Sequence, residues 1–258
     1  MIEKRCVGIS VRGAGHKKSN MPCQDAGRVR FTPQGILIAA VADGAGSARH
    51  SEVGAAIAVD AAMVKLEERF SVEELSGTDH DFRECLLDVT RVARQQVIDE
   101  ARRLGVEKED LACTLILCVA SGTQVVVFHI GDGAVVVRTM DGVLQTLSAP
   151  ANGEYFNETD FLTQPNFDAC GRFSSCVGKL SDVAIITDGL ELVAIDLRTF
   201  APFDRFFNPL MDFFRQAESG DDIKMQIEEF LQSPLLCERT DDDLTLALAS
   251  WIPKLSQE

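Results

Sequence analysis

Three long apolar segments, each ending at an Asp-Gly pair, are the feature that most restricts how this 258-residue chain can fold. A run of consecutive apolar residues bounded by turn residues is typical of a strand that is buried on both faces. The end of such a strand is rigid, so an acidic residue placed there is held in a defined position. The sequence therefore predicts a layered β structure that delivers several carboxylates to fixed points. The segments are 36–42, 125–130 and 183–187, and the pairs that follow them are Asp43-Gly44, Asp132-Gly133 and Asp188-Gly189.

Composition and charge exclude several classes of protein. Hydrophobic residues make up 46% of the chain and charged residues 25%, as in ordinary globular proteins. No apolar stretch is long enough for a membrane span, and residues 1–5 lack the apolar core of a signal peptide. The formal net charge of −15 argues against a nucleic-acid-binding surface, which needs clustered Lys and Arg. We therefore expect a cytoplasmic protein with neither a membrane nor a nucleic-acid partner, whose eight cysteines are reduced.

The order of the predicted elements favours two antiparallel sheets covered by helices. A Ser-Gly turn at 121–122 and an Asp-Gly turn at 141–142 indicate hairpins, and no regular strand–helix alternation supports a parallel sheet. Residues 149–180 show weak periodicity and are expected to form a loop or short strands, and no linker divides the chain. We expect a single domain over residues 1–258. The predicted helices are 51–70 (capped by Ser51), 81–104, 203–217 and 221–232, and the predicted strands are 4–12, 27–32, 35–42, 111–120, 124–131, 134–138, 143–147, 182–187 and 244–251.

The acidic residues at the predicted strand ends suggest a metal site. Carboxylates crowded together repel one another and take up protons unless a cation is shared between them. Hard cations such as Mg²⁺ and Mn²⁺ prefer oxygen ligands, and no His or Cys accompanies these acids. A single Asp-Gly pair is most often an ordinary turn, as expected for Asp141-Gly142. Several such pairs at strand ends, together with the acidic cluster 241–243 before the last strand, favour the metal interpretation.

An ordered series of motifs extends over nearly the whole chain, from about residue 8 to 249. It consists of Gly13-Ala14-Gly15-His16 with Cys23-Gln24-Asp25-Ala26, then Val41-Ala42-Asp43-Gly44-Ala45-Gly46-Ser47, His129-Ile130-Gly131-Asp132-Gly133, Ile186-Thr187-Asp188-Gly189-Leu190 and Asp242-Asp243-Leu244-Thr245-Leu246. The series resembles the motifs of the metal-dependent protein serine/threonine phosphatases, the type 2C or PPM family, in a compact form of bacterial type. Each motif alone is weak, but the ordered set is specific.

The resemblance implies an α+β fold, an αββα four-layer sandwich of two mainly antiparallel sheets flanked by helix pairs. It also implies two Mn²⁺ or Mg²⁺ ions and the one-step hydrolysis of phosphoserine and phosphothreonine by a water that the two ions activate. The implied substrate is a phosphoprotein, paired with a Ser/Thr kinase in signalling. The implied metal-site residues are Asp43 as the bridging carboxylate, Gly44 through its carbonyl, Asp188 and Asp242 as further ligands, Asp132 with Asp188 at a third, weaker ion, and Asp25 acting through a water ligand.

The chain departs from the family pattern near its start and end. Many members place an Arg before the first acidic pair to bind phosphate, whereas this chain has His16 and Lys17 there. We expect His16 to contact phosphate or donate a proton, with Lys17 as the second candidate, against the alternative of a solvated basic loop. Gln24 replaces an acidic residue, and Asp243 stands where many members have Asn, so that Asp242 is the better match to the ligand.

Two alternative functions stay open. The departures at His16 and Gln24 suggest a catalytically weak or inactive module that keeps the phosphatase fold for regulation or binding. The other alternative is a metal phosphohydrolase that acts on small molecules or nucleotides. An enzyme with an aspartate nucleophile would need a second Asp close after Asp43, which Gly44-Ala45 does not supply, and the same glycines lack the spacing of a dinucleotide-binding loop.

Overall fold

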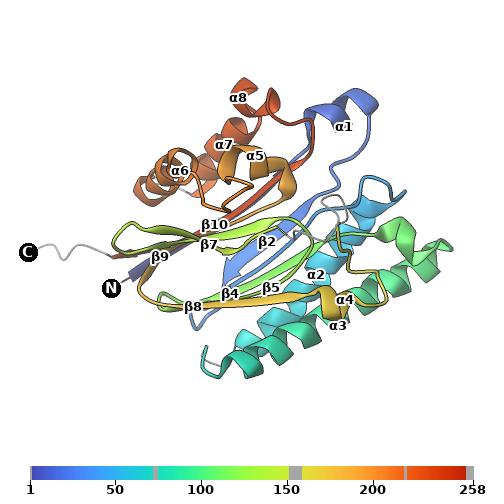
Figure 1. Cartoon of the computed structure of the whole chain (residues 1–258), viewed down its shortest axis with the longest axis horizontal. Helices are drawn as coiled ribbons and strands as arrows, with labels where there is room; N and C mark the ends of the chain where they lie inside the picture. Colours follow the sequence, from blue (N-terminus) through green and yellow to red (C-terminus); the bar gives the residue numbers. More distant parts are fainter. Residues whose placement is uncertain (1, 72–74, 151–158, 218–219, 254–258) are drawn as a thin grey trace, which may run out of the picture.

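The computed structural model of the chain contains two five-stranded β-sheets packed face to face, with helices on both outer sides (Figure 1). It describes residues 2–71, 75–150, 159–217 and 220–253. The layers follow the order helix, sheet, sheet, helix, so the predicted αββα arrangement is confirmed. None of the described helices is both long and apolar enough to cross a lipid bilayer.

Every pair of neighbouring strands in both sheets is antiparallel. The first sheet joins the two ends of the chain, because the first strand of the chain pairs with the last strand of the chain along ten residues. Its order is β1 (Ile2–Val11), β10 (Leu244–Pro253), β9 (Leu180–Ile186), β6 (Ala134–Thr139) and β7 (Leu144–Ser148). The second sheet has the order β2 (Ala26–Phe31), β3 (Leu37–Ala42), β4 (Leu115–Ala120), β5 (Gln124–Ile130) and β8 (Arg172–Val177).

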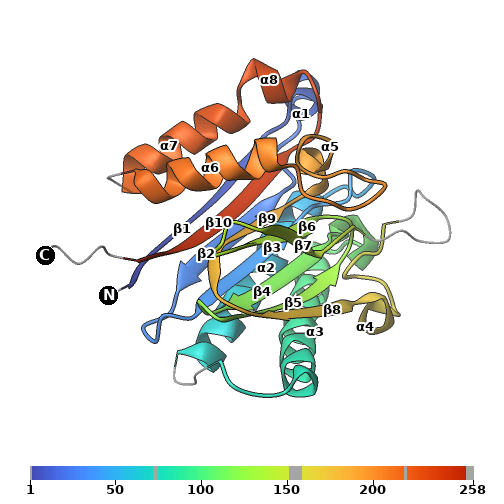
Figure 2. The same cartoon turned by 60° about the vertical axis from the view of Figure 1, so that its left-hand side comes forward.

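The helices form two layers on opposite sides of the sheets (Figures 1 and 2). Two long helices cover the second sheet, and four helices cover the first. The covering helices are α2 (Ser51–Phe70) and α3 (Asp79–Leu104) on one side, and α5 (Glu191–Ala194), α6 (Asp204–Gln216), α7 (Gly220–Leu231) and α8 (Pro234–Cys237) on the other. The remaining short helices are α1 (Ala14–Ser19), α4 (Phe167–Cys170), η1 (Lys108–Leu111) and η2 (Asp188–Leu190).

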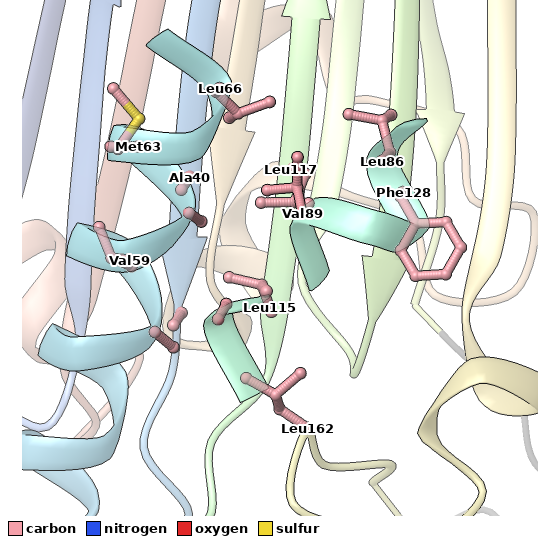
Figure 3. Packing of buried hydrophobic residues seen from close by; sticks show 14 of the residues in the cluster. Ala40, Val59, Met63, Leu66, Leu86, Val89, Leu115, Leu117, Phe128 and Leu162 are labelled. Carbon is pink, nitrogen blue, oxygen red and sulfur yellow. The ribbon is translucent and has the colours of Figure 1, made fainter. Parts of the chain in front are cut away.

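Strand β3 shows why its sequence is apolar without interruption. Successive side chains of a strand point to opposite faces. Ile38 and Ala40 pack with α2 and α3, whereas Leu37 and Val41 pack between the two sheets. Figure 3 shows the helix-facing core, in which Leu117 and Phe128 of the sheet lie against Val89 and Leu86 of α3. The strand is therefore buried on both faces, as the sequence predicts.

The predicted cap of one helix differs in the structure. Ser51 does not cap its helix but is its first residue; the preceding His50 occupies the capping position without a side-chain hydrogen bond. The prediction of Ser51 as the cap is therefore wrong. The region 149–180 contains the short helix α4 and strand β8, consistent with the short strands expected there, and residues 151–158 lie outside the described part of the chain.

A buried carboxylate anchors α6 to the first sheet. The side chain of Asp182 on β9 is fully buried, and its Oδ2 lies 2.8 Å from Nε of Arg138 and 3.6 Å from Nη1 of Arg215. Ser181 and Ser250 donate further hydrogen bonds to the same carboxylate. Arg138 also pairs with Asp212 of α6 at 2.7 Å.

We expect Asp182→Ala to lower the free energy of unfolding by about 3–5 kcal/mol, because it leaves Arg138 without its buried partner. Asp212→Ala is the matched control: it removes a carboxylate that is 55% exposed and should cost below about 1 kcal/mol. Urea titration followed by circular dichroism measures both. Equal losses in the two variants would contradict the importance of the buried pair.

Candidate metal centre

Asp43 is fixed at the end of β3 by its own backbone. Its N–H donates to Thr114 Oγ1 at 2.8 Å, and the N–H of Thr114 donates to the Asp43 carbonyl at 2.8 Å. A Cβ atom on the next residue, Gly44, would lie 2.8 Å from the Gln24 carbonyl oxygen and 2.8 Å from Cβ of Ser51. Only glycine fits this close approach. In this Asp-Gly pair, the backbone of Asp43 fixes the position of its carboxylate, and Gly44 lets the chain pass between Gln24 and Ser51.

Asp43, Asp132 and Asp188 meet at one end of the sandwich. One carboxylate oxygen from each lies within 4.8 Å of the others. Asp43 follows β3 and Asp132 follows β5, both in the second sheet, whereas Asp188 follows β9 in the first sheet. The three Asp-Gly pairs singled out in the sequence thus come together across the interface between the two sheets.

Asp25 lies beside this cluster and is held by two threonines. Its Oδ2 accepts hydrogen bonds from Oγ1 of Thr187 and Oγ1 of Thr245, each at 2.8 Å. The Asp43 carboxyl group is also within hydrogen-bonding reach of Asp25. The two threonines come from β10 and from the end of β9, so the first sheet orients a carboxylate that enters from the second.

Asp242 belongs to a second group of possible ligands. One ligand atom each from His16, Asp242 and Asp243 lies within 4.8 Å of the others. Asp242 is exposed, and its charge acts on Asp188, so the two groups are neighbours. The structure therefore places Asp242 beside the three-aspartate cluster but does not bring it within the same ligand distance.

Both carboxylate oxygens of the buried Asp243 accept hydrogen bonds from backbone N–H groups. Its Oδ1 accepts from the Gly13 N–H at 2.7 Å, and its Oδ2 accepts from the Gln24 N–H at 2.6 Å. Nδ1 of His16 lies 2.8 Å from Oδ2, a close contact that is not aligned as a hydrogen bond. Asp243 therefore holds the turn that carries His16, while Lys17 lies exposed on α1.

The electrostatics fit a cation site. Burial, followed by the neighbouring carboxylates, raises the pKa values of Asp43 and Asp188 well above the usual range. Burial also raises the pKa of Asp25, against the hydrogen bonds from its two threonines. Asp132 Oδ2 accepts from Thr159 Oγ1 at 2.6 Å, while its Oδ1 is buried without a partner in the described part of the chain. Crowded oxygen donors with unmet charge are the set that a hard divalent cation prefers.

Glu191 is a further acidic residue at this site that sequence reasoning missed. It is the first residue of α5, and its Oε1 is buried without a hydrogen-bond partner among the described residues. Burial, with Asp188 and Asp132 nearby, raises its pKa to about 8. The only signal in the sequence was its position three residues after Asp188, which puts it on the next helical turn.

Arg172 ties the loop that carries Asp132 to its surroundings. Its Nη2 donates to the carbonyls of Gly131 at 2.8 Å and Ala149 at 3.1 Å, and it lies 3.1 Å from Nδ1 of His129. Ser148 Oγ lies 2.9 Å from the same Nδ1. The ring of His129 is thus held neutral between the two sheets.

His129 should make the fold sensitive to acid. Burial, and then Arg172, lower its pKa well below 6.5, so on acidification the unfolded chain binds a proton that the folded chain refuses. The contribution of the neutral His129 to the free energy of unfolding is complete above pH 6.5 and falls below that pH, by about 2 kcal/mol at pH 5. We therefore expect that, in EDTA, lowering the pH from 7.5 to 5 reduces the free energy of unfolding of the native chain by about 2 kcal/mol more than that of His129→Gln. Parallel pH profiles would contradict this prediction.

Comparison with known proteins identifies the family. The sequence profile of the protein phosphatase 2C family matches residues 12–232. The chain belongs to the protein phosphatase 2C family. It is 35% identical over 255 residues to serine/threonine-protein phosphatase 3 of Escherichia coli (strain K12), with 96% of this chain and 98% of that protein covered. The family and the enzyme class predicted from the sequence, a metal-dependent protein serine/threonine phosphatase, are thereby confirmed.

Solved structures support the fold of this phosphatase 2C chain. A bacterial serine phosphatase superposes with a TM-score of 0.68 at 15% identity, covering 98% of this chain and 100% of the other. The catalytic domain of the serine/threonine protein phosphatase PstP, in complex with two manganese ions, superposes with a TM-score of 0.63 at 15% identity and covers 98% and 100%. At such low identity the likeness extends to the fold alone.

Proposed function

We propose that this chain hydrolyses phosphoserine and phosphothreonine in proteins with two Mn²⁺ or Mg²⁺ ions held by its clustered carboxylates. The observation that carries the proposal is the meeting of Asp43, Asp132 and Asp188 within 4.8 Å, across two sheets. The manganese-bound PstP domain, which shares the fold, supports the choice of ion. When bound, such ions would lower the pKa of a water molecule and orient it toward phosphorus.

The chain offers a consistent set of ligands for these ions. Asp43 would bridge them, and the Gly44 carbonyl, Asp188 and Asp242 would complete the protein ligands. Between the adjacent acids, Asp242 is the better ligand because both oxygens of Asp243 already accept backbone hydrogen bonds. Asp132 has a free buried oxygen and would hold a third, weaker ion with Asp188.

Asp25 and the residues of α1 would act on solvent and substrate. Asp25, oriented by Thr187 and Thr245, would accept a proton or hydrogen bond from solvent beside the ions. His16, whose Nδ1 lies 2.8 Å from Asp243 and whose side chain is 17% exposed, would contact the phosphate or donate a proton to the leaving oxygen. Lys17 is exposed on the same short helix and would attract the phosphate from solution.

We also propose a setting for this activity. Residues 1–258 would act as one catalytic domain, since both sheets supply acidic residues to the same site. A cytoplasmic location is supported by the absence of any disulfide between cysteines in the described residues. The partner would be a phosphoprotein whose phosphate is added by a Ser/Thr kinase.

Hydrolysis assays test the proposal. We expect turnover of p-nitrophenyl phosphate and of a phosphothreonine peptide with Mn²⁺, and background rates in EDTA. Tight binding of Mn²⁺ by calorimetry without turnover of either substrate would instead favour an inactive regulatory module. Turnover that persists in EDTA would contradict the metal-dependent chemistry.

A further inference from the structure

A cavity of 540 Å³ lies in the helical layer that covers the first sheet. Helices α6 and α7 run side by side in this layer, with α5 and α8 at one end of the pair (Figure 2). The floor and walls of the cavity are apolar and include Phe206, Leu210, Ile227 and Leu236. These side chains are buried and also belong to the core beneath the helices. The cavity is therefore a half-open groove whose floor is the packed core and whose rim includes the exposed side chains of Phe213 and Leu235, and its volume is typical of a small-molecule site.

The charged residues that line the cavity are all basic. Arg205 of α6 and Arg239, which follows α8, are both exposed and both border the cavity. Neither forms an ion pair with any residue in the described ranges, although the guanidinium of Arg205 lies 4.8 Å from the ring centre of Phe203. Among the residues that the structure describes, no acidic side chain lines the cavity, although the chain has 40 acidic and 25 basic residues. The cavity therefore favours an anionic ligand, although the net charge of the whole protein is negative.

The chemistry of the wall decides between a peptide and a simpler ligand. A peptide brings one donor and one acceptor per residue, and each must be paired when it is buried. Apart from the two arginines, Gln226 is the one polar side chain among the described residues that line the cavity. A hydrocarbon chain has no such requirement and gains free energy in proportion to the apolar area that it buries. An apolar body with one charged end is therefore the better match.

We propose that this cavity binds an amphipathic carboxylate, with its hydrocarbon chain between α6, α7 and α8 and its carboxylate at Arg205 and Arg239. The carboxylate would accept charge-assisted hydrogen bonds from one or both guanidinium groups. Two lining residues lie close in sequence to the candidate metal ligands. Val193 of α5 comes five residues after Asp188, and Arg239 comes three residues before Asp242. A ligand here would sit against both segments that lead to those aspartates.

Calorimetry with the whole protein in EDTA tests the proposal without any use of phosphatase activity. The probes are dodecanoate, dodecylamine and acetate, each below its aggregation concentration. We expect saturable binding of one dodecanoate per chain in the micromolar range, at least tenfold weaker binding of dodecylamine, and no binding of acetate. Equal binding of dodecanoate and dodecylamine would overturn the role of the arginines, and no saturable binding of dodecanoate would overturn the site.

Matched charge reversals locate the ligand. The double variant Arg205→Glu/Arg239→Glu should bind dodecanoate at least tenfold more weakly. Arg102→Glu/Arg103→Glu, on α3 in the opposite helical layer, makes the same change in net charge and should bind as the native chain does. Unchanged Mn²⁺-dependent hydrolysis of p-nitrophenyl phosphate would show that both variants fold. Equal losses in the two double variants, or binding of an acidic apolar peptide in place of dodecanoate, would overturn the proposal.

Discussion

Replacement of Asp43 by Asn should lower the Mn²⁺-dependent kcat for p-nitrophenyl phosphate by about 10³-fold or more. The substitution keeps the size of the side chain and the backbone pairing with Thr114, but it removes the negative charge. That charge is the one proposed to be shared by two cations. Without it, the remaining acids at the site would not hold both ions in the geometry that stabilises the developing charge on phosphorus.

Asp141→Asn is the matched control, because Asp141 also begins an Asp-Gly turn but accepts only a local hydrogen bond from Thr139. Its kcat should stay within a factor of two of the native value, on the order of an uninvolved surface change. Thermal unfolding gives an independent readout. Asp43→Asn should be more stable than the native chain in EDTA, since burial and the neighbouring carboxylates oppose the charge of Asp43, and Mn²⁺ should stabilise it less. Retention of a tenth of the native kcat would contradict the bridging role.

The fold could be predicted from the sequence because the strands and the helices of the sandwich each have their own pattern of apolar residues. Strands such as β3 and β5 lie between two layers, so both of their faces are apolar and the run is continuous. The long helix α3 shows an apolar stripe and ends at Gly105, which adopts the left-handed backbone conformation expected of a C-cap. The cap of α2 was predicted one residue too late. Ser51 is a good capping residue by type, but it is already the first residue of the helix, and His50 occupies the capping position.

The site was predictable only in part, for a related reason. Asp43, Asp132 and Asp188 each end a strand, so local sequence indicates where they lie. Glu191 and the pair Thr187 and Thr245 do not follow from local sequence, because their roles depend on which strands become neighbours. The choice between the adjacent acids 242 and 243 also required the structure, since it rests on two backbone N–H groups more than 200 residues earlier in the chain.

Gly189→Ala should be the most damaging substitution that removes no functional side chain. A Cβ atom at Gly189 would lie 2.0 Å from the carbonyl oxygen of Asp243 and 3.0 Å from Cδ2 of Leu244. Real Cβ atoms essentially never approach other atoms closer than 3.0 Å, so the segments that carry Asp188 and Asp242 must separate by about 1 Å. A displacement of this size at a catalytic site can lower the rate by about 10²-fold. We expect a loss of that order in kcat with Mn²⁺.

Gly46→Ala is the matched control, because Gly46 lies in the loop after Asp43 and a Cβ there would meet no atom within 4 Å. Its kcat should be close to that of the native chain. Gly189→Ala should also need more Mn²⁺ for half-maximal activity, whereas its free energy of unfolding in EDTA should fall by only about 1–3 kcal/mol. The combination matters, because a loss of stability alone would reduce the amount of folded enzyme without changing its demand for metal. An unchanged Mn²⁺ requirement in folded Gly189→Ala would mean that the spacing between the Asp188 and Asp242 segments does not set the metal geometry, and the assignment of Asp242 as a ligand would then fail.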